Sequence, residues 1–179
     1  MGLLDKLRNN ASRDAQEDAG PAPLSVFLDA GCAIVPTSGR VMPLSEVPDP
    51  VFADGAMGQG LGVAPTDGIV YAPMSGLIAT IGAPNYHAIM LAADNGAEIL
   101  IHVGVDTVEL RGRGFDVLAS KGDHVPAGSP LLAFDSSAIR AAGYDDTVIM
   151  CVANTKDFES VELVCEGEAK AGDTGLKIS

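Results

Sequence analysis

The 179-residue sequence contains no tryptophan, and aromatic residues make up only 4 % of it. A chain of this length buries a substantial core, so that core must be built mainly from aliphatic side chains. No apolar run approaches the roughly 18 residues that a membrane-spanning helix needs, and the charged start MGLLDKLRNN is too short for a secretory signal. These absences predict a cytoplasmic protein that does not cross a membrane.

Cysteine is also scarce, and the three residues Cys32, Cys151 and Cys165 do not have the spacing of a metal or redox motif. An odd number of cysteines without a signal sequence favours reduced thiols. We therefore expect all three to be buried and to behave as small apolar side chains.

Basic residues are few, with 11 Lys and Arg against 24 Asp and Glu, which gives a net charge of −13. Such a charge argues against nucleic acid as a partner, because phosphate backbones attract basic surfaces. Residues 41–110 contain no Lys or Arg at all, and no GxxxxGK[ST] phosphate-binding loop occurs anywhere. The acidic residues of this segment are Glu46, Asp49, Asp54, Asp67, Asp94, Glu98, Asp106 and Glu109. A partner that binds here should therefore be basic.

Glycine and proline, by contrast, are abundant (21 and 11 residues) and divide the chain into short apolar segments. This pattern predicts an all-β, antiparallel sandwich or barrel-like domain over residues 24–179. Strands are expected near 32–35, 60–63, 68–71, 76–81, 87–93, 98–105, 130–134, 147–153 and 161–164. Single helical turns are expected at 115–119 and 135–142, the second capped by Asp135 or Ser136.

The first 23 residues differ in composition from the rest and are expected to form a flexible segment. Residues 1–10 place leucines on one side and basic residues beside them, a pattern typical of a short amphipathic helix with weak affinity for a membrane surface. A frayed polar terminus explains the same residues equally well. The sequence thus leaves open a peripheral association with the inner face of the membrane.

Alternation along EILIHVGVDTVEL, which begins at residue 98, separates two faces of one predicted strand. Ile99, Ile101 and Val103 point to one side, which is an apolar core face. His102 points to the other side, as does Asp106 at the end of the strand. The histidine is therefore expected outside the core.

A hairpin is expected to bring a second histidine to the same surface. The Asn-Gly pair at 95–96 lies between two apolar strands, which is the strongest short hairpin signal. With this pair at the two central turn positions, His87 faces Gly104 and His102 faces Ile89, so the imidazoles are diagonal neighbours. A turn shifted at both flanks would place them directly opposite. The third histidine, in KGDHVPAG, is expected to face solvent.

Three kinds of chemistry suit two converging imidazoles. Zinc could bind both, but a structural site needs four ligands and a catalytic site three. A serine nucleophile would need a nearby Ser, and no GxSxG elbow is present. The third is a histidine nucleophile that accepts a phosphoryl group. A second imidazole can donate a hydrogen bond to that group, and a cation for the transition state can come from a partner.

Six blocks of sequence, in one order, carry a family resemblance. They are MGLLDKLRNN, EVPDPVFADGAMGQGLGVAPTDG, APMSGLIATIG, HAIMLAADNGAEILIHVGVDTVELRGRGF, KGDHVPAGSPLLAFD and TVIMCVANTKDFE. The chain resembles the glucose-type IIA components of the bacterial phosphoenolpyruvate-dependent sugar phosphotransferase system over nearly its whole length. The fourth block, which holds both histidines and HVGVDTVEL, is the most specific. The resemblance implies an antiparallel β-sandwich.

By that resemblance, His102 is the phosphoacceptor and His87 the second active-site histidine. The implied reaction is transfer from the phosphohistidine of the carrier protein HPr to His102, and then to a cysteine of a IIB domain in a membrane sugar permease. Two positions depart from the family pattern. Asn85 stands where the family usually has Thr and could still offer an amide hydrogen bond, and Gln59 replaces a common Asp.

The resemblance also implies a docking face for partners. Asp49 and Asp106 match acidic positions that meet an arginine of HPr, while Val51 and Phe52 match the apolar rim of the same face. Gly104 is expected to leave room beside the phosphoacceptor for the phosphoryl group. No cofactor is required. Relatives also regulate permeases and glycerol kinase when unphosphorylated, in one case through zinc held by both histidines and a partner carboxylate.

Two other classes of protein remain as alternatives. A biotinyl or lipoyl carrier would explain APMSG and KGDHVPAGSPLLAF, but it needs a lysine at a hairpin tip, and none occurs between Lys6 and Lys121. A LytM-type zinc endopeptidase would need a His-x-His pair, whereas Val103 and Gly104 follow His102. Stoichiometric zinc in the isolated protein would favour the peptidase.

Overall fold

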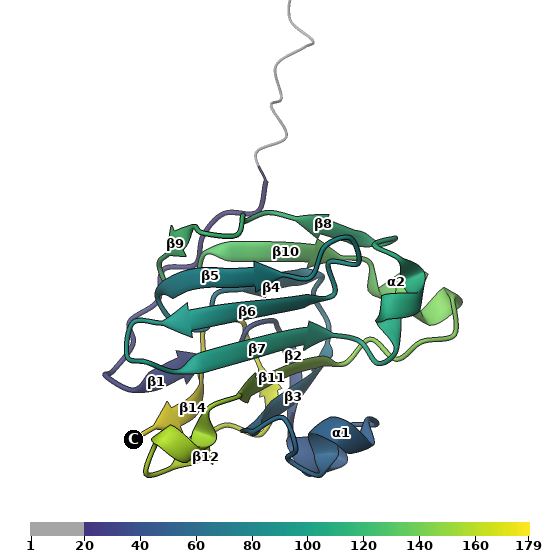
Figure 1. Cartoon of the computed structure of the whole chain (residues 1–179). Helices are drawn as coiled ribbons and strands as arrows, with labels where there is room; N and C mark the ends of the chain where they lie inside the picture. The colour runs from purple at the N-terminus through teal and green to yellow at the C-terminus, as the bar shows by residue number, and fades with distance from the viewer. Residues whose placement is uncertain (1–19) are drawn as a thin grey trace, which may run out of the picture.

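Fourteen strands and five short helices form the regular structure of residues 20–179, the part of the chain that this computed structural model describes (Figure 1). The strands are Cys32–Ile34 (β1), Gly39–Pro43 (β2), Gln59–Pro65 (β3), Ile69–Tyr71 (β4), Gly76–Ile81 (β5), Ala88–Ala93 (β6), Glu98–Val103 (β7), Phe115–Val117 (β8), His124–Val125 (β9), Pro130–Phe134 (β10), Val148–Val152 (β11), Val161–Leu163 (β12), Gly167–Ala169 (β13) and Thr174–Ile178 (β14). The helices are the α-helices Pro50–Ala53 (α1) and Ser136–Ala141 (α2), and the 3-10 helices Leu44–Glu46 (η1), Thr107–Leu110 (η2) and Thr155–Asp157 (η3).

The strands form three antiparallel sheets. An eight-stranded sheet has the order β13-β2-β3-β11-β7-β6-β5-β9, and two three-stranded sheets have the orders β4-β10-β8 and β1-β14-β12. Strand β7 lies near the middle of the large sheet, between β11 and β6. The predicted fold class, all-β and antiparallel with short helical turns, is confirmed.

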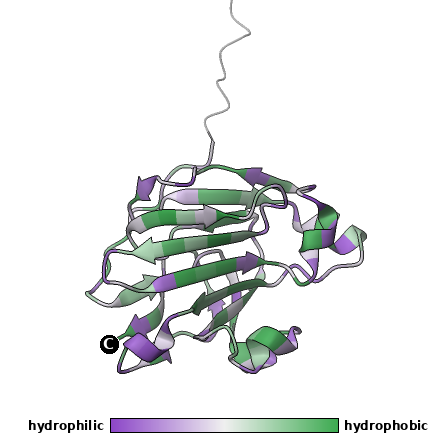
Figure 2. Ribbon diagram, viewed as in Figure 1, coloured by the Kyte–Doolittle hydropathy of each residue, from purple (hydrophilic) through white to green (hydrophobic). Residues whose placement is uncertain are grey.

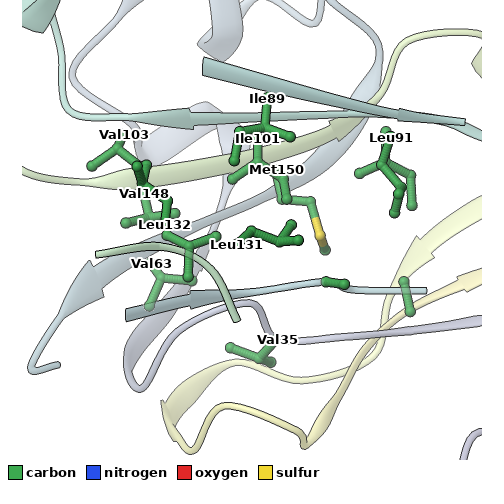
Figure 3. Close-up of a cluster of buried hydrophobic side chains, with 14 of the residues drawn as sticks. Val35, Val63, Ile89, Leu91, Ile101, Val103, Leu131, Leu132, Val148 and Met150 are labelled. Atoms are coloured by element: carbon green, nitrogen blue, oxygen red, sulfur yellow. The ribbon is translucent and has the colours of Figure 1, made fainter. Parts of the chain in front are cut away.

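The core lies between the sheets and is mainly aliphatic, as the lack of aromatic residues requires. Figure 3 shows Leu131 and Leu132 of β10 among inward side chains of the large sheet, including Ile101 and Met150. These side chains are all almost completely buried. Figure 2 shows the same division along the ribbon, because the strands carry mostly hydrophobic residues and the hydrophilic ones gather in loops and at strand ends.

A second, smaller apolar cluster lies on the outer face of the large sheet. Its buried members are Met42, Leu44, Val47, Phe52, Ile149 and Cys151. Helices η1 and α1 supply Leu44 and Phe52, while β11 supplies Ile149 and Cys151. Because β11 is buried on both faces, the two clusters share this strand. Phe52 of α1 therefore packs against β11, the strand next to β7 in the sheet, and α1 itself lies close to β3 in the view of Figure 1.

Every predicted strand is present, although two other segments differ from expectation. Residues 115–119 do not form a helical turn; they begin with β8, because Phe115 pairs with Phe134 of β10 and enters the main core. The strand predicted to reach residue 105 ends at Val103, where Gly104 takes a positive φ of 78°. The second helical turn is confirmed as α2, and the Asp135 carboxylate accepts a hydrogen bond from the Ala138 amide.

Several elements were not predicted. Strands β2, β9, β13 and β14 lie in segments that were interpreted as turns or left unassigned. Helix α1 lies in a segment interpreted as a loop, although Asp49 followed by Pro50 is a recognisable helix start. The amphipathic helix predicted at 1–10, and most of the segment 1–23, lie outside the described residues. Within the part of the chain that is described, no helix is long and apolar enough to cross a membrane.

The cysteines are all unpaired, as expected. Cys151 is fully buried, and burial raises its thiol pKa to about 12. Cys32 and Cys165 are only half-buried, so the expectation of complete burial was wrong for these two. No role in a redox pair follows from any of them.

Candidate active site

His102 lies on the outer face of β7, as the alternation of the strand predicts. Its neighbours Ile101 and Val103 are buried in the main core, whereas the His102 side chain is half-buried on the opposite face. In the sheet it pairs with Ile149 of β11 on one side and with Ala88 of β6 on the other. The imidazole therefore stands over the centre of the sheet, at the edge of the outer apolar cluster.

One ring nitrogen of His102 has a fixed partner. Nδ1 lies 2.8 Å from the carbonyl oxygen of Gly104. A carbonyl can only accept a hydrogen bond, so Nδ1 carries the proton and donates it. In the neutral ring the lone pair is then on Nε2, so Nε2 is the ring nitrogen that could act as a nucleophile.

Gly104 positions this carbonyl through a backbone turn. Its φ of 78° is in the left-handed region, and an added Cβ would collide with the Thr107 side chain and lie 2.7 Å from the Asp145 carbonyl oxygen. Gly104 is itself buried. Gly104 thus faces Thr107 and Asp145, which fill the space where its Cβ would lie, and the predicted room for a phosphoryl group beside His102 stays a prediction. The contribution of Gly104 to the site is the direction of its carbonyl group.

The hairpin that joins β6 and β7 has a register one residue away from the predicted one. Ala93 and Ala97 close the loop, with the Ala93 amide donating to the Ala97 carbonyl at 2.8 Å. The loop thus contains three residues, 94–96, and Gly96 takes a φ of 90°, as in a turn with a glycine bulge. His102 consequently pairs with Ala88 rather than Ile89.

The two imidazoles nevertheless converge. The ring centroids of His87 and His102 lie 4.8 Å apart at an interplanar angle of 83°, an edge-to-face arrangement. His87 precedes the first residue of β6, and the preceding Tyr86 has a φ of 55°, so the strand alternation does not dictate the direction of the His87 side chain. The turn over residues 82–86 positions the His87 side chain instead, and in this turn the Tyr86 amide donates a hydrogen bond to the Gly82 carbonyl at 2.7 Å.

His87 differs from His102 in its hydrogen bonding. Nδ1 of His87 is buried and has no partner among the described residues. Burial lowers the pKa of His87, and the nearby Asn85 carbonyl opposes this shift without reaching hydrogen-bond geometry. The described residues offer the Asn85 side-chain amide no hydrogen bond either. The amide hydrogen bond predicted for Asn85 therefore stays a prediction.

The surroundings of His102 favour the neutral form of its ring. Burial lowers the pKa of His102 from its ordinary value of 6.5, and the adjacent His87 ring lowers it further. The Gly104 carbonyl and the carboxylates of Asp49 and Asp106 oppose the shift but do not cancel it. A neutral imidazole retains the Nε2 lone pair that a nucleophile needs.

Helix α1 brings Asp49 and an aromatic ring to the site. Asp49 caps the helix, since its carboxylate accepts a hydrogen bond from the Val51 amide at 2.9 Å. The ring of Phe52 lies against His102, with centroids 5.3 Å apart. Phe52 is only 5 % exposed, so of the two residues predicted for an apolar rim, only Val51, at 53 %, presents its side chain to solvent.

A second exposed apolar residue follows soon after β7 and was not singled out from the sequence. Val108 is 41 % exposed and belongs to η2, which begins directly after the exposed Asp106. The sequence contained a hint of this exposure, because Val108 does not fall on the alternating positions (99, 101, 103) whose side chains enter the core. Two short helices thus each begin with a carboxylate followed two residues later by an exposed valine: Asp49 with Val51 in α1, and Asp106 with Val108 in η2.

Metal binding by this chain alone is not supported. No group of three or more His, Cys, Asp and Glu side chains suited to a metal ion occurs among residues 20–179. The two imidazoles supply two ligands at most, one short of a catalytic zinc site. His124 does not join them: it is exposed, as predicted, and bonds to Asp94 at 2.8 Å.

The structure is a mainly β protein with antiparallel sheets, and it has a two-histidine site on the outer face of its largest sheet. Comparison with known proteins identifies the family. The model of the phosphoenolpyruvate-dependent sugar phosphotransferase system, EIIA 1 family matches residues 33–158. The chain belongs to this family, and the predicted resemblance is confirmed.

Individual relatives agree with this assignment. The chain is 40 % identical over 139 residues to a glucose-specific EIIA component of Staphylococcus aureus, covering 78 % of this chain and 83 % of that protein. It is 46 % identical over 136 residues to the beta-glucoside-specific EIIBCA component of Dickeya chrysanthemi, covering 76 % of this chain but 21 % of the relative. The raffinose carrier protein of Pediococcus pentosaceus is 43 % identical over 145 residues, covering 80 % of this chain and 22 % of the carrier. The chain thus spans about a fifth of the length of these longer relatives.

A solved structure shares the fold. Glucose permease IIA from Mycoplasma capricolum superposes with a TM-score of 0.72 at 30 % identity, covering 86 % of this chain and 98 % of that one. Family membership, relatives and fold together support a phosphocarrier role in a sugar phosphotransferase system. The biotinyl-carrier and LytM-peptidase alternatives are thereby excluded.

Proposed function

We propose that His102 accepts a phosphoryl group from the phosphohistidine of HPr and passes it to a cysteine of a IIB domain. The observation that carries this proposal is the 2.8 Å contact between His102 Nδ1 and the Gly104 carbonyl oxygen, which leaves Nε2 free for attack. Family membership supports the class of reaction. The residue and the atom are the new elements of the proposal.

In the first transfer, the Nε2 lone pair forms a bond to phosphorus while the phosphorus–nitrogen bond of the donor breaks. The electron pair of that bond stays on the donor ring, which leaves as a neutral imidazole if its other nitrogen carries a proton. His102 keeps its Nδ1 proton and becomes positively charged. The Gly104 carbonyl, which accepts from Nδ1, and the carboxylates of Asp49 and Asp106 stabilise that charge.

His87 acts on the phosphoryl group rather than on the nucleophile. Its ring stands edge-to-face to His102, and no acceptor in hydrogen-bond geometry holds a proton on Nδ1. The proton can therefore lie on Nε2, from which the ring can donate to a phosphoryl oxygen without the fixed charge of an arginine. An amide hydrogen bond from Asn85, two residues earlier, stays a prediction.

The surroundings of His102 suit a basic partner with an apolar centre. Asp49 and Asp106 both supply negative charge near His102, and Val51 and Val108 supply exposed apolar surface. A partner arginine that bridges the carboxylates also brings positive charge to the transferring phosphoryl group, as arginines do in other phosphoryl transfers. This arrangement favours HPr as the donor.

The acceptor in the proposal is the IIB domain of a membrane sugar permease. Two of the relatives are named EIIBCA components, and their names join an EIIA part to EIIB and EIIC parts in one protein. The sugar is not proposed, because it is chosen by the permease. Regulation of permeases or kinases by the unphosphorylated form, zinc shared between the two histidines and a partner, and contact of residues 1–10 with the membrane surface stay predictions.

The test is reconstitution with phosphoenolpyruvate, enzyme I and HPr, followed by mass spectrometry of the acid-labile adduct. The proposal predicts one phosphoryl group, located on His102, which disappears on addition of an acceptor IIB domain. Phosphate on another residue, or none at all, would overturn the assignment.

A further inference from the structure

We propose that Phe52 is a positioning residue for phosphoryl transfer at His102, holding the imidazole in its reactive orientation instead of forming part of the surface that partners touch. This inference rests on the proposed function, because it concerns the orientation of the proposed nucleophile. It starts from the 5.3 Å between the Phe52 and His102 ring centroids, at an interplanar angle of 53°.

Phe52 is itself firmly held. The Phe52 amide donates to the Asp49 carbonyl at 3.2 Å, and the Phe52 carbonyl accepts from the Gly55 amide at 2.9 Å. Its side chain belongs to the outer apolar cluster with Ile149 and Cys151 of β11. A ring packed on a central strand from one side and tied into a capped helical turn from the other has little freedom to move.

Three contacts then define the orientation of the imidazole. The Gly104 carbonyl holds Nδ1, the Phe52 ring packs at a tilt, and the His87 ring meets it edge-to-face. The second torsion of a histidine side chain has a broad, roughly two-fold preference. The Gly104 hydrogen bond sets which nitrogen faces the backbone, and the Phe52 contact opposes rotation away from it. Nε2 is thereby aimed at one position.

Burial separates this role from partner docking. Phe52 exposes 5 % of its surface, whereas Val51, its neighbour on α1, exposes 53 %. A side chain that is already buried adds almost no contact area to a complex. Its truncation should therefore affect the rate of transfer within the complex more than the affinity for the partner. The exposed Val51 gives the opposite expectation. The two adjacent residues therefore form a matched pair.

Phe52 also takes part in desolvating the nucleophile. Burial is the largest cause of the lowered pKa of His102, and the Phe52 ring is one of the groups that cover the imidazole. Replacement by a smaller apolar residue admits water to this side of the ring. We expect the pKa of His102 to move back toward its ordinary value of 6.5.

The experiment compares Phe52→Leu with Val51→Ala in transfer from phospho-HPr, with the donor concentration varied. Phe52→Leu should lower kcat about tenfold or more with KM nearly unchanged, because a small misplacement of a reacting group costs a large factor in rate. Val51→Ala should raise KM and leave kcat unchanged. An unchanged kcat in Phe52→Leu, or a rise in KM that matches Val51→Ala, would overturn the positioning role.

A second measurement is made first on the wild-type protein, so that the positioning role can be tested even if Phe52→Leu folds poorly. Nitrogen-15 NMR of the His102 ring should show one tautomer, protonated on Nδ1, and Phe52→Leu should show averaging between tautomers and a raised pKa. Averaging already in the wild type would overturn the proposal. Failure of the wild type to accept phosphate on His102 would instead overturn the proposed function, so the two failures are distinguishable.

Discussion

His102 Nδ1 and the Gly104 carbonyl oxygen lie 2.8 Å apart, two residues from each other along the chain. Strand β7 ends between them, and the positive φ of Gly104 turns its carbonyl back toward the ring. The residue that follows the end of the strand thus also selects the tautomer of His102. Replacement of this glycine should damage stability and reactivity together.

Gly104→Ala tests that link. An alanine at positive φ costs about 1–2 kcal/mol, and the collision with Thr107 and the Asp145 carbonyl adds about 1–3 kcal/mol. We expect the free energy of unfolding to fall by about 2–5 kcal/mol, and transfer to His102 to slow in the folded fraction. Denaturant unfolding and phosphorylation rates measure the two effects.

Gly96→Ala is the matched control for this variant. Gly96 also has a positive φ, but nothing lies within 4 Å of an added Cβ there. It should lose only about 1–2 kcal/mol and transfer normally. Equal losses of stability and rate in the two variants would show that the surroundings of Gly104 have no special role.

His102→Ala and His87→Ala should separate the roles of the two imidazoles. His102→Ala should abolish phosphorylation by phospho-HPr, because the nucleophilic nitrogen is gone. His87→Ala should still accept the phosphoryl group but pass it on slowly, since the donor to the phosphoryl oxygens is lost. Single-turnover assays with phospho-HPr and then with a IIB domain measure the two steps. Labelling of His102→Ala at full rate would assign the acceptor to another residue.

The free energy of unfolding should decrease as the pH falls below about 6.5. Burial lowers the pKa of His102 in the folded protein, so the unfolded chain, with its ordinary value of 6.5, binds a proton that the folded state does not. This single group contributes a slope of at most about 1.4 kcal/mol per pH unit, which ends once the pH passes below the folded pKa.

His102→Gln removes this titration and serves as the comparison. Denaturant unfolding of wild type and variant at several pH values between 7.5 and 5 measures the difference between their free energies of unfolding, which should grow as the pH falls. Parallel curves for the two proteins would mean that the folded pKa of His102 is not lowered.

Asp49→Asn should weaken docking without disturbing the helix that carries Phe52. Asparagine caps helices about as well as aspartate, so α1 should keep its start, while one negative charge beside the site is lost. The KM for phospho-HPr should rise about 2- to 5-fold and depend less steeply on salt. Asp135→Asn changes the N-cap of α2 in the same way and provides the control.

An equal rise of KM in Asp135→Asn would mean that overall charge, and not the position of Asp49, attracts the donor. Melting curves of both variants should match the wild type within the usual range of exposed substitutions. The steady-state assay at two ionic strengths gives both the KM and its salt dependence.

The sequence contained enough local information to place His102 on the correct face, because the alternation of Ile99, Ile101 and Val103 is visible in the letters themselves. The register of the hairpin was not fixed in the same way. An Asn-Gly pair fits both a two-residue turn and a three-residue loop with a glycine bulge, and the structure has the second. The convergence with His87 was thus predicted correctly from an incorrect register.

Contacts between distant segments were beyond local patterns. Residues 115–117 have a composition that suits a helical turn, but pairing with β10 makes them a strand. Nothing near Phe52 in the sequence indicates that its ring lies on His102, since that contact depends on how α1 folds over β11. The same limit applies to Gly104, because the groups that fill the space where its Cβ would lie come from Thr107 and from Asp145.

Strand β11 belongs to two apolar clusters, the main core and the outer cluster, and we expect these clusters to differ in the free energy of local opening. All five residues of β11 are buried, so their amides should be among the slowest to exchange with deuterated solvent. The outer cluster has only six buried members, and local opening of α1 should expose its amides far more often than global unfolding does. His102 thus stands on strands expected to exchange slowly, beside an outer cluster expected to open locally, and hydrogen exchange should resolve the two as separate cooperative units.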